Sequence, residues 1–454
     1  MKILSVIFLF LLNAMFGAGQ STTNSVAKTD TMRMTWQQCV DYALQNQVAV
    51  KNSKLDADIS HRQTQEYTGI ALPQVNGNFQ FADYLKLPTS LIPAEFFGGE
   101  PGTFVPLQFG TQYNGTASVS LSQLVFDGRY FLGLKASRAL ADLSQKKVQQ
   151  TEIDTREKVM KAYLAALIAA KRAEQLDVNI KSFKKTYDDT KEIYKTGFVE
   201  KVDVDRIAVG YNNLLAEKHN VDEYVALSIY MLKFQMGMDV NQPLVLTDSL
   251  READFQSVLQ NAATPDINNR IEYQMLLNSK SLSEMNIKRY QYGYIPTLYA
   301  NASYSYQAQV NQFDLIPSST WYNTAFIGFN FSLPIFDGLQ KARQVQQARL
   351  SLTQTENNIF DFQNAMSLQV ASAKTSMQNA IEGLNVQKSN LDLAQEIVTI
   401  SRKKFELGAG TSIEVTDAET SLKDAQTNYL NALYDAWVAR IDLEKALGTL
   451  KDQQ

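Results

Sequence analysis

Cysteine and histidine are almost absent from this chain of 454 residues. The single cysteine, Cys39, excludes an intrachain disulfide, so stability must come from packing or assembly, and we expect Cys39 to be a small apolar residue on a helix face. The two histidines, His61 and His219, lie in separate helical stretches, without a nucleophile elbow, a phosphate loop or a metal-spaced cluster nearby. The sequence therefore argues against an enzyme and predicts no cofactor and no metal. A formal net charge of -4 gives no indication of a nucleic-acid partner.

Long apolar runs are confined to the N-terminus. Residues 1–19 combine a positive charge at Lys2, an apolar stretch and small residues at 17–19, which is the pattern of a secretory signal peptide. We expect a linker over 20–34 to follow it. Beyond the signal, no run approaches the roughly 20 apolar residues that a membrane-spanning helix needs. An exported chain of this kind is periplasmic, secreted or a β-barrel.

Proline is absent from two long segments, 129–196 and 339–407, and matching motifs flank both. Phe-Asp-Gly precedes each segment, with a separation of 210 between the two aspartates (337 − 127), and a glycine follows each, with a separation of 211 (408 − 197). Such self-similarity indicates an internal duplication. We assign residues 35–250 to the first structural repeat and 251–454 to the second.

The proline-free segments have the periodicity of long helices. Apolar residues recur at coiled-coil spacing in both, as at Leu176, Ile180 and Phe183 in the first copy and at Leu391 and Val398 in the second. A helix of about 70 residues would be roughly 100 Å long and would need neighbours along its whole length. Helices are predicted at about 35–70, 128–196 and 201–236 in the first repeat, and at about 266–292, 338–407 and 411–447 in the second.

Particular residues mark the ends of these helices. Thr35 and Gln38 have the spacing of a capping box, in which each side chain bonds the other residue's backbone N–H. Asp127 and Asp337 each follow a predicted strand and precede a long helix, so we expect a turn and cap role for both.

Between Pro and Asp-Gly, each repeat carries two segments in which apolar and polar residues alternate. This period of two over about ten residues predicts strands with one apolar and one polar face. The four strands are predicted at about 74–85, 111–125, 297–307 and 324–334. Four strands cannot close a barrel, so the barrel must be shared between chains, and three chains would supply twelve strands. The segment from Leu85 to Gly110 is expected to be a long extracellular loop.

In this order, the duplicated motifs resemble the TolC-type outer membrane efflux protein family. The resemblance rests on residues 36–47 near the start, both Phe-Asp-Gly turns, both glycine-centred helix tips and Ala446-Leu447-Gly448-Thr449-Leu450 at the end. It implies an α+β membrane protein of the Gram-negative outer membrane: a homotrimer with a shared 12-stranded β-barrel and an α-helical coiled-coil tunnel in the periplasm. The implied function is the exit duct of a tripartite efflux pump or type I secretion system. The implied partners are outer membrane lipid, a periplasmic adaptor and an inner-membrane pump.

The resemblance also places the pore constriction just beyond the two helix tips. It implies a carboxylate ring formed by Glu414 and Asp417, and a role for Asp203 in holding the mouth closed. A simpler role for these acids is to stabilise the positive ends of helices. The tips themselves are expected at Gly197 and Gly408, with Tyr194 and Phe405 before them.

This chain departs from the family's pattern at the tips. Two residues after Gly408, where family members carry an arginine that ties the closed mouth, the chain has Gly410; Arg206 is a candidate substitute. Phe405 stands where the family has a tyrosine, so the hydroxyl bond is lost. The alternative function is an extracellular or periplasmic coiled-coil protein without a pore, which would explain the helices but not the four strands.

Overall fold

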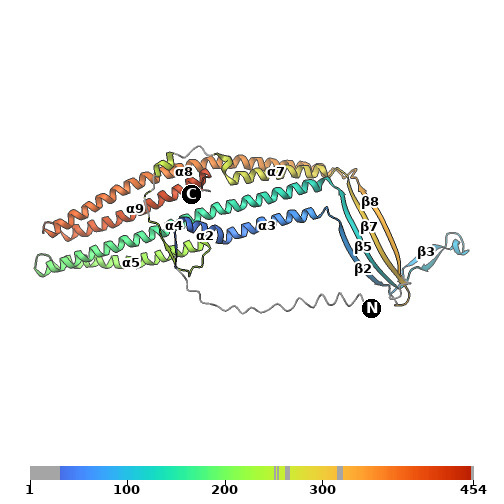
Figure 1. Ribbon diagram of the computed structural model, residues 1–454, viewed down its shortest axis with the longest axis horizontal. Helices are drawn as coiled ribbons and strands as arrows, with labels where there is room; N and C mark the ends of the chain where they lie inside the picture. The colour runs from blue at the N-terminus through green and yellow to red at the C-terminus, as the bar shows by residue number, and fades with distance from the viewer. Residues whose placement is uncertain (1–30, 250–251, 253–254, 261–265, 314–320, 451–454) are drawn as a thin grey trace.

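The computed structural model describes residues 31–454 except 250–251, 253–254, 261–265, 314–320 and 451–454. The predicted signal peptide and most of the predicted linker lie outside the described residues. The molecule is elongated, with helices over most of its length, a four-stranded sheet towards one end and a small hairpin beyond the sheet (Figure 1). This arrangement separates a helical half from a β half.

Two helical hairpins form most of the helical half. In the first repeat, α4 (Gly128–Lys195) is followed by α5 (Lys201–Met236). In the second repeat, α8 (Gln340–Glu406) is followed by α9 (Ser412–Leu447). Both hairpins end at the same end of the molecule, opposite the sheet (Figure 1). Among the described residues, no helix has both the length and the apolar character needed to cross a bilayer.

The predicted apolar seams lie inside these hairpins. Leu176 and Phe183 of α4 cluster with Leu214 and Val221 of α5. The second repeat uses the same arrangement, with one face of α8 packed on one face of α9. Its buried residues are Ala394, Val398, Ala418, Leu422 and Ala425. Each long helix therefore uses one seam within its own hairpin, as the coiled-coil spacing predicts.

The single helix predicted over about 35–70 is interrupted, and this part of the prediction was wrong. The structure has α2 (Trp36–Asn46) and α3 (Val48–Gly69), with Gln47 in an extended conformation between them. An added Cβ at Gly237, just after α5, would approach the backbone of Asn46 and Gln47 to 2.8 Å. The break lets the end of α5 pack closely against the N-terminal helices, a tertiary contact with no local sequence signal. The capping box of Thr35 and Gln38 is confirmed.

The start of the second long helix also differs from expectation. Asp127 caps α4 as predicted, since its carboxylate accepts a hydrogen bond from the Arg129 backbone N–H at 2.8 Å. Asp337 does not occupy the equivalent position, because α8 begins after Leu339, which has a left-handed backbone (φ 67°). The Asp337 carboxylate instead accepts from the Lys341 backbone N–H at 3.1 Å. The Asp337 side chain therefore still caps the first turn of the helix, but it bonds a residue four positions later, whereas Asp127 bonds one two positions later.

The sheet is antiparallel, in the order β2-β5-β7-β8. Its strands are β2 (Gln74–Asp83), β5 (Tyr113–Phe126), β7 (Thr297–Val310) and β8 (Trp321–Ser332). The two repeats meet where β5 pairs with β7. Register sets such as Val75, Leu121, Ala302 and Ile327 place apolar residues on one face, and polar residues occupy most of the other face. Ile327 is 84% exposed, so the apolar face is uncovered in a single chain.

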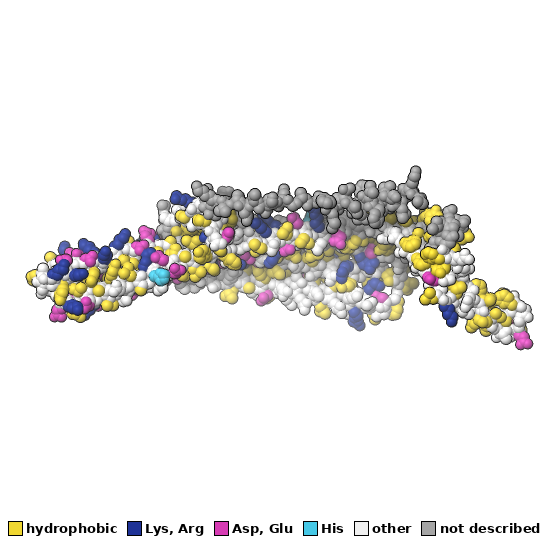
Figure 2. Space-filling model, turned by 90° about the horizontal axis from the view of Figure 1, so that it is seen from below, with side chains coloured by type: hydrophobic (Ala, Val, Ile, Leu, Met, Phe, Trp, Pro, Cys, Tyr) yellow, Lys and Arg dark blue, Asp and Glu magenta, His cyan; other side chains and the backbone are white. Residues whose placement is uncertain are grey.

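The segment expected to be a loop over Leu85 to Gly110 contains a second, smaller sheet, so that prediction was wrong. The hairpin consists of β3 (Thr89–Pro93), a 3-10 turn (Ala94–Phe97) and β4 (Phe104–Gln108). It projects beyond the main sheet, and side chains over both regions are largely apolar, whereas charges gather over the helices (Figure 2). Three prolines and several glycines within the hairpin interrupt the alternation of apolar and polar residues, so alternation did not predict these two strands.

A short parallel pair, β1 (Met32–Met34) with β6 (Leu244–Leu246), ties the first described residues to the connection between the repeats. Within the predicted linker, residues 32–34 are therefore a strand. The pair covers a core at the middle of the molecule that includes Cys39, Tyr163 and Leu232. The second repeat begins with α6 (Phe255–Gln260), a 3-10 turn (Ile267–Asn269) and α7 (Ile271–Tyr292).

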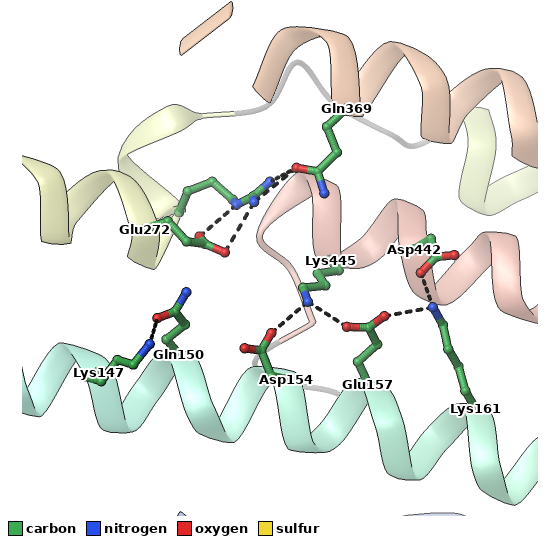
Figure 3. A network of polar contacts seen from close by, with 10 residues as sticks. Lys147, Gln150, Asp154, Glu157, Lys161, Glu272, Gln369, Asp442 and Lys445 are labelled. Atoms are coloured by element: carbon green, nitrogen blue, oxygen red, sulfur yellow. Dashed lines mark hydrogen bonds and ion pairs between the residues drawn. The ribbon is translucent and has the colours of Figure 1, made fainter. Parts of the chain in front are cut away.

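Charged side chains join the two repeats at this level (Figure 3). Lys445 of α9 donates to Asp154 and Glu157 of α4 at 2.7 and 2.6 Å, and Lys161 lies between Glu157 and Asp442. Burial would raise the pKa of Glu157, but hydrogen bonds from the two lysines outweigh it and lower the pKa. Glu157 therefore stays ionised, which favours a fixed relation between α4 and α9.

Candidate functional site

The tip of each helical hairpin is a tight, glycine-centred turn. Gly197 has φ 81°, and the Phe198 N–H donates to the Ile193 carbonyl at 3.4 Å. Gly408 has φ 73°, and the Ala409 N–H donates to the Lys404 carbonyl at 2.9 Å. These are the bonds of a helix that ends on a left-handed glycine, the conformation in which glycine has no steric penalty. The two tips are thus built in the same way in both repeats.

The helices that leave the tips also begin in the same way. Glu200 precedes α5, and its backbone N–H donates to the Asp203 carboxylate at 3.1 Å. Thr411 precedes α9, and its hydroxyl accepts from the Glu414 backbone N–H at 3.2 Å. Asp203 and Glu414 therefore lie at equivalent places in the first turns, where a negative charge stabilises the helix.

The predicted acids of the constriction lie on the open surface of the second tip. Glu414 and Asp417 are both exposed and lie three residues apart on α9, so their side chains share one face of the helix. The buried face of this turn is formed instead by Ser412 and Val415. Within one chain the two carboxylates are thus free to face a second copy or a pore.

A polar contact joins the two tips through Asp203, Arg206 and Ser412. The Arg206 guanidinium donates to the Ser412 hydroxyl at 3.0 Å and lies 3.4 Å from the Asp203 carboxylate. The Ser412 hydroxyl, which is almost fully buried, donates to the same carboxylate. Asp203 and Arg206 belong to α5 and Ser412 to α9, so the three side chains bridge the repeats.

The aromatic residues before the tips differ in their surroundings. Phe405 is 8% exposed and fills the end of the second hairpin, whereas Tyr194 is 43% exposed. Gly410 lies against the last turn of α8, because an added Cβ would come within 3.1 Å of the Lys404 side chain. A larger residue at this position would require the turn to shift.

A second bridge between the hairpins was missed by the sequence analysis. Arg402 of α8 donates to the carboxylate of Glu419 on α9 and to the hydroxyl of Ser182 on α4. Glu419 is 3% exposed, and its burial raises the pKa of the carboxyl, although Arg402 opposes that rise. The available signal was a glutamate beside Ala418 in an otherwise apolar seam.

Together, these features define a class of protein: a protomer in which an open antiparallel sheet with an uncovered apolar face continues into long helical hairpins. Residues 279–449 match the family model described as Outer membrane efflux protein. The chain is 25% identical to the outer membrane protein TolC of Salmonella enteritidis over 349 residues, which cover 74% of this chain and 70% of that protein. It is 20% identical to the alkaline protease secretion protein AprF of Pseudomonas aeruginosa, over 74% of this chain and 70% of that one.

Solved structures share the fold. The outer membrane channel CmeC of Campylobacter jejuni superposes with a TM-score of 0.70 at 16% identity, covering 91% of this chain and 85% of CmeC. The outer membrane protein VceC of Vibrio cholerae gives a TM-score of 0.69, also at 16% identity, over 91% of this chain and 96% of VceC.

The chain belongs to the TolC-type outer membrane efflux protein family. It is an efflux channel of the outer membrane and not an enzyme, which confirms the predicted fold class, function and location and sets aside the coiled-coil protein without a pore. Membership implies trimeric assembly within an efflux system.

Proposed function

We propose that three copies of the chain form one duct whose inner mouth is lined by Glu414 and Asp417. The observation that carries this proposal is the exposure of both carboxylates on one face of α9, directly beside the bridge of Asp203, Arg206 and Ser412. Three chains would bring six carboxylates around one axis. Such a ring favours cations and repels anions.

The edges of the sheet support the trimer. Among the residues that the structure describes, β2 and β8 each pair with another strand on one side only. In lipid, unpaired backbone groups cost several kcal/mol each, so the edges require partners. Pairing of β8 with β2 of the next copy would extend the sheet, and three chains would close a barrel of 12 strands. The apolar face would then contact outer membrane lipid.

The surfaces of the helices support the same assembly. Beyond its buried seam, α8 carries a second apolar stripe at spacings of seven, four and three residues, and this stripe is about half-exposed. It consists of Val386, Leu393, Ile397 and Ile400. A stripe with coiled-coil spacing indicates a further helical neighbour. On α5, a similar exposed stripe contains Tyr224, Leu227, Met231 and Phe234. Contacts between copies would cover these surfaces and complete the tunnel wall.

The bridge between the tips supplies a lock for the closed mouth. Arg206 reaches Ser412 from α5, and so it would hold the two tips together in the closed duct. Opening would move α9 away from α5 and break this contact.

The exposed apolar residues at the tips, Phe198 (86%) and Leu407 (75%), are suited to contact a periplasmic adaptor protein, which would connect the duct to an inner-membrane pump.

The test is ion selectivity of the purified trimer in a planar bilayer under a salt gradient. The wild-type channel is expected to be cation-selective, and the double variant Glu414→Gln/Asp417→Asn to lose most of this selectivity. A charge-matched control is Asp188→Asn/Glu192→Gln, which removes two exposed acids from α4 and should leave the reversal potential unchanged. Conduction with an unchanged reversal potential in the tip variant would contradict the carboxylate ring.

A further inference from the structure

A cavity of about 420 Å³ lies where the helices meet the sheet, at the opposite end of the tunnel from the tips. Both repeats form its wall: the end of α3 and the start of α4 from the first, and the end of α7 and the start of α8 from the second. Its polar side chains include Tyr67, Arg129, Arg289, Tyr290, Tyr299 and Lys341. A volume in this range is typical of small-molecule sites.

Three basic side chains line the cavity, and two of them form ion pairs with carboxylates. Arg129 makes a paired contact with Asp127, at 2.8 and 3.0 Å, and Lys341 lies 3.1 Å from Asp337. Arg289 is different, because it donates to the Tyr290 hydroxyl at 3.2 Å and lies over that ring. In the part of the chain that the structure describes, no carboxylate forms an ion pair with Arg289. One guanidinium per chain is therefore available to an anion.

Tyrosines supply hydrogen-bond donors and flat walls. Tyr67 and Tyr290 occupy equivalent positions, each six residues before the proline that ends its helical segment. Tyr67 stacks on Tyr130, with ring centroids 5.8 Å apart and planes at 5°. Burial, with the nearby Asp127 charge, raises the pKa of Tyr67, so its hydroxyl remains protonated and able to donate. A guanidinium beside phenol donors and ring faces complements an oxyanion attached to an aromatic body.

The cavity lies on the polar side of the sheet. Leu124 and Tyr299, which line it, are register partners two positions from the pair of Ser122 and Asn301 on the polar face. Residues two apart on a strand point to the same side. In a barrel embedded in lipid with its apolar face outward, this side is the lumen.

We propose that this cavity is a binding site inside the duct for an organic oxyanion, such as a carboxylate or sulfonate, carried on an aromatic ring. Arg289 is the principal contact for the anion, and the two equivalent tyrosines Tyr67 and Tyr290 are contacts for the ring. This proposal depends on the proposed function in one point: the polar face of the sheet must line the lumen of the barrel. The anion site would then lie between the acidic mouth and the lumen of the barrel.

The test uses pyranine, an aromatic trisulfonate, and the fluorescence anisotropy of its complex with the detergent-solubilised trimer. Arg289→Gln is expected to weaken binding about tenfold or more, the effect of losing a charged hydrogen bond of roughly 1.5–3 kcal/mol. Arg289→Lys, which keeps the charge, should restore part of the affinity. Arg62→Gln on α3 is the matched control, because Arg62 is exposed, bonds only Gln65 among the described residues and lies outside the cavity. Inorganic phosphate should compete with the dye.

Equal binding by wild type and Arg289→Gln would overturn the site, as would a failure of phosphate to compete. A phosphate-free detergent, dodecyl maltoside, and nanodiscs of phosphatidylcholine separate a luminal anion from a lipid phosphate, because only the second supplies a phosphate group. Equal dye binding in both supports the lumen, and loss of binding in the nanodiscs would overturn that placement. Glu414→Gln/Asp417→Asn should bind pyranine as wild type does, so failure of the carboxylate ring and failure of this site are distinguishable.

Discussion

Arg206 and Ser412 lie 206 positions apart in the chain, and yet the guanidinium of the first donates to the hydroxyl of the second at 3.0 Å. Because Arg206 belongs to the first repeat and Ser412 to the second, this contact exists only while the two helix tips are together. The nearby Asp203 carboxylate accepts from both side chains and holds them in one geometry. In the proposed duct, breaking this contact would accompany opening of the tips.

Substitution of Arg206 by glutamine should open the channel more often. A partly exposed contact of this kind contributes about 0.2–1 kcal/mol, which is roughly a 1.4- to 5-fold change in the closed–open equilibrium for each chain. Open probability in single-channel recordings measures the effect. Lys195→Gln is the matched control, since Lys195 lies near the same tip but pairs with Glu192 inside α4. A larger effect in the control than in Arg206→Gln would contradict the lock.

Loss of Arg402 should destabilise the trimer in a pH-dependent way. Removing one partner of a fully buried ion pair costs about 3–5 kcal/mol, because the other charge remains buried. The Arg402 side chain is 35% exposed, so the loss here should be smaller than that range. Without Arg402, the folded-state pKa of Glu419 rises further above its unfolded value, so the folded state binds the proton more tightly. Stability from this group is then greatest below the unfolded pKa, and it is lost as pH rises through the folded pKa.

Thermal unfolding of Arg402→Met followed by circular dichroism at pH 7.5 and pH 5 measures this effect. The variant should regain part of its lost stability at the lower pH, relative to wild type. Arg172→Met is the control, because Arg172 pairs with the more exposed Glu217 at 3.5 Å. An equal loss for Arg402→Met at both pH values would show that Glu419 is not the group left unpaired.

Two glycines should respond to alanine with opposite signs. Gly408 has φ 73° and Gly383 lies inside α8, and an added Cβ would meet no atom within 4 Å at either position. Gly408→Ala should cost about 1–2 kcal/mol, because the left-handed backbone is strained for alanine. Gly383→Ala should stabilise by about 1 kcal/mol, because alanine is the better helix former. Unfolding midpoints in guanidinium chloride compare the two; destabilisation by Gly383→Ala would mean that its exposed face is covered in the trimer.

The thiol of Cys39 should be inert in the folded protein. Burial, with a smaller effect of the Asp248 charge, raises its pKa to about 12. At pH 8 the reactive thiolate is then about one part in ten thousand. Iodoacetamide, followed by mass spectrometry, should leave Cys39 unmodified in the folded trimer and label it after denaturation. Rapid labelling of the folded trimer would contradict a buried thiol.

The duplication made the main elements predictable. A glycine after each proline-free segment located both hairpin tips, and alternation located the four strands of the sheet. These signals are local, since they depend on the conformation of one turn or on the two faces of one strand. They also placed Asp203 and Glu414 in equivalent first turns.

The remaining features depend on contacts between distant parts of the chain. The break at Gln47 lies against Gly237, and the contact of Arg206 with Ser412 requires the two hairpins to lie side by side. The pair of Arg402 and Glu419 is formed across a hairpin, and neither residue belongs to a motif. Periodicity cannot report such contacts, because it describes each segment alone.

The pairing of β5 with β7 has a consequence for how the protein is made. On one side β5 pairs with β2, which precedes it in the chain, but its partners on the other side are Leu298 to Val310. Nearly two hundred further residues must therefore leave the export machinery before the central pair of the sheet can form. Until then the backbone N–H and C=O groups on one edge of β5 are unpaired, and they could pair with a strand of another chain in the periplasm. Biogenesis must therefore shield a half-finished sheet, and a chaperone that retains the first hairpin until the second arrives would decide the yield of functional channels.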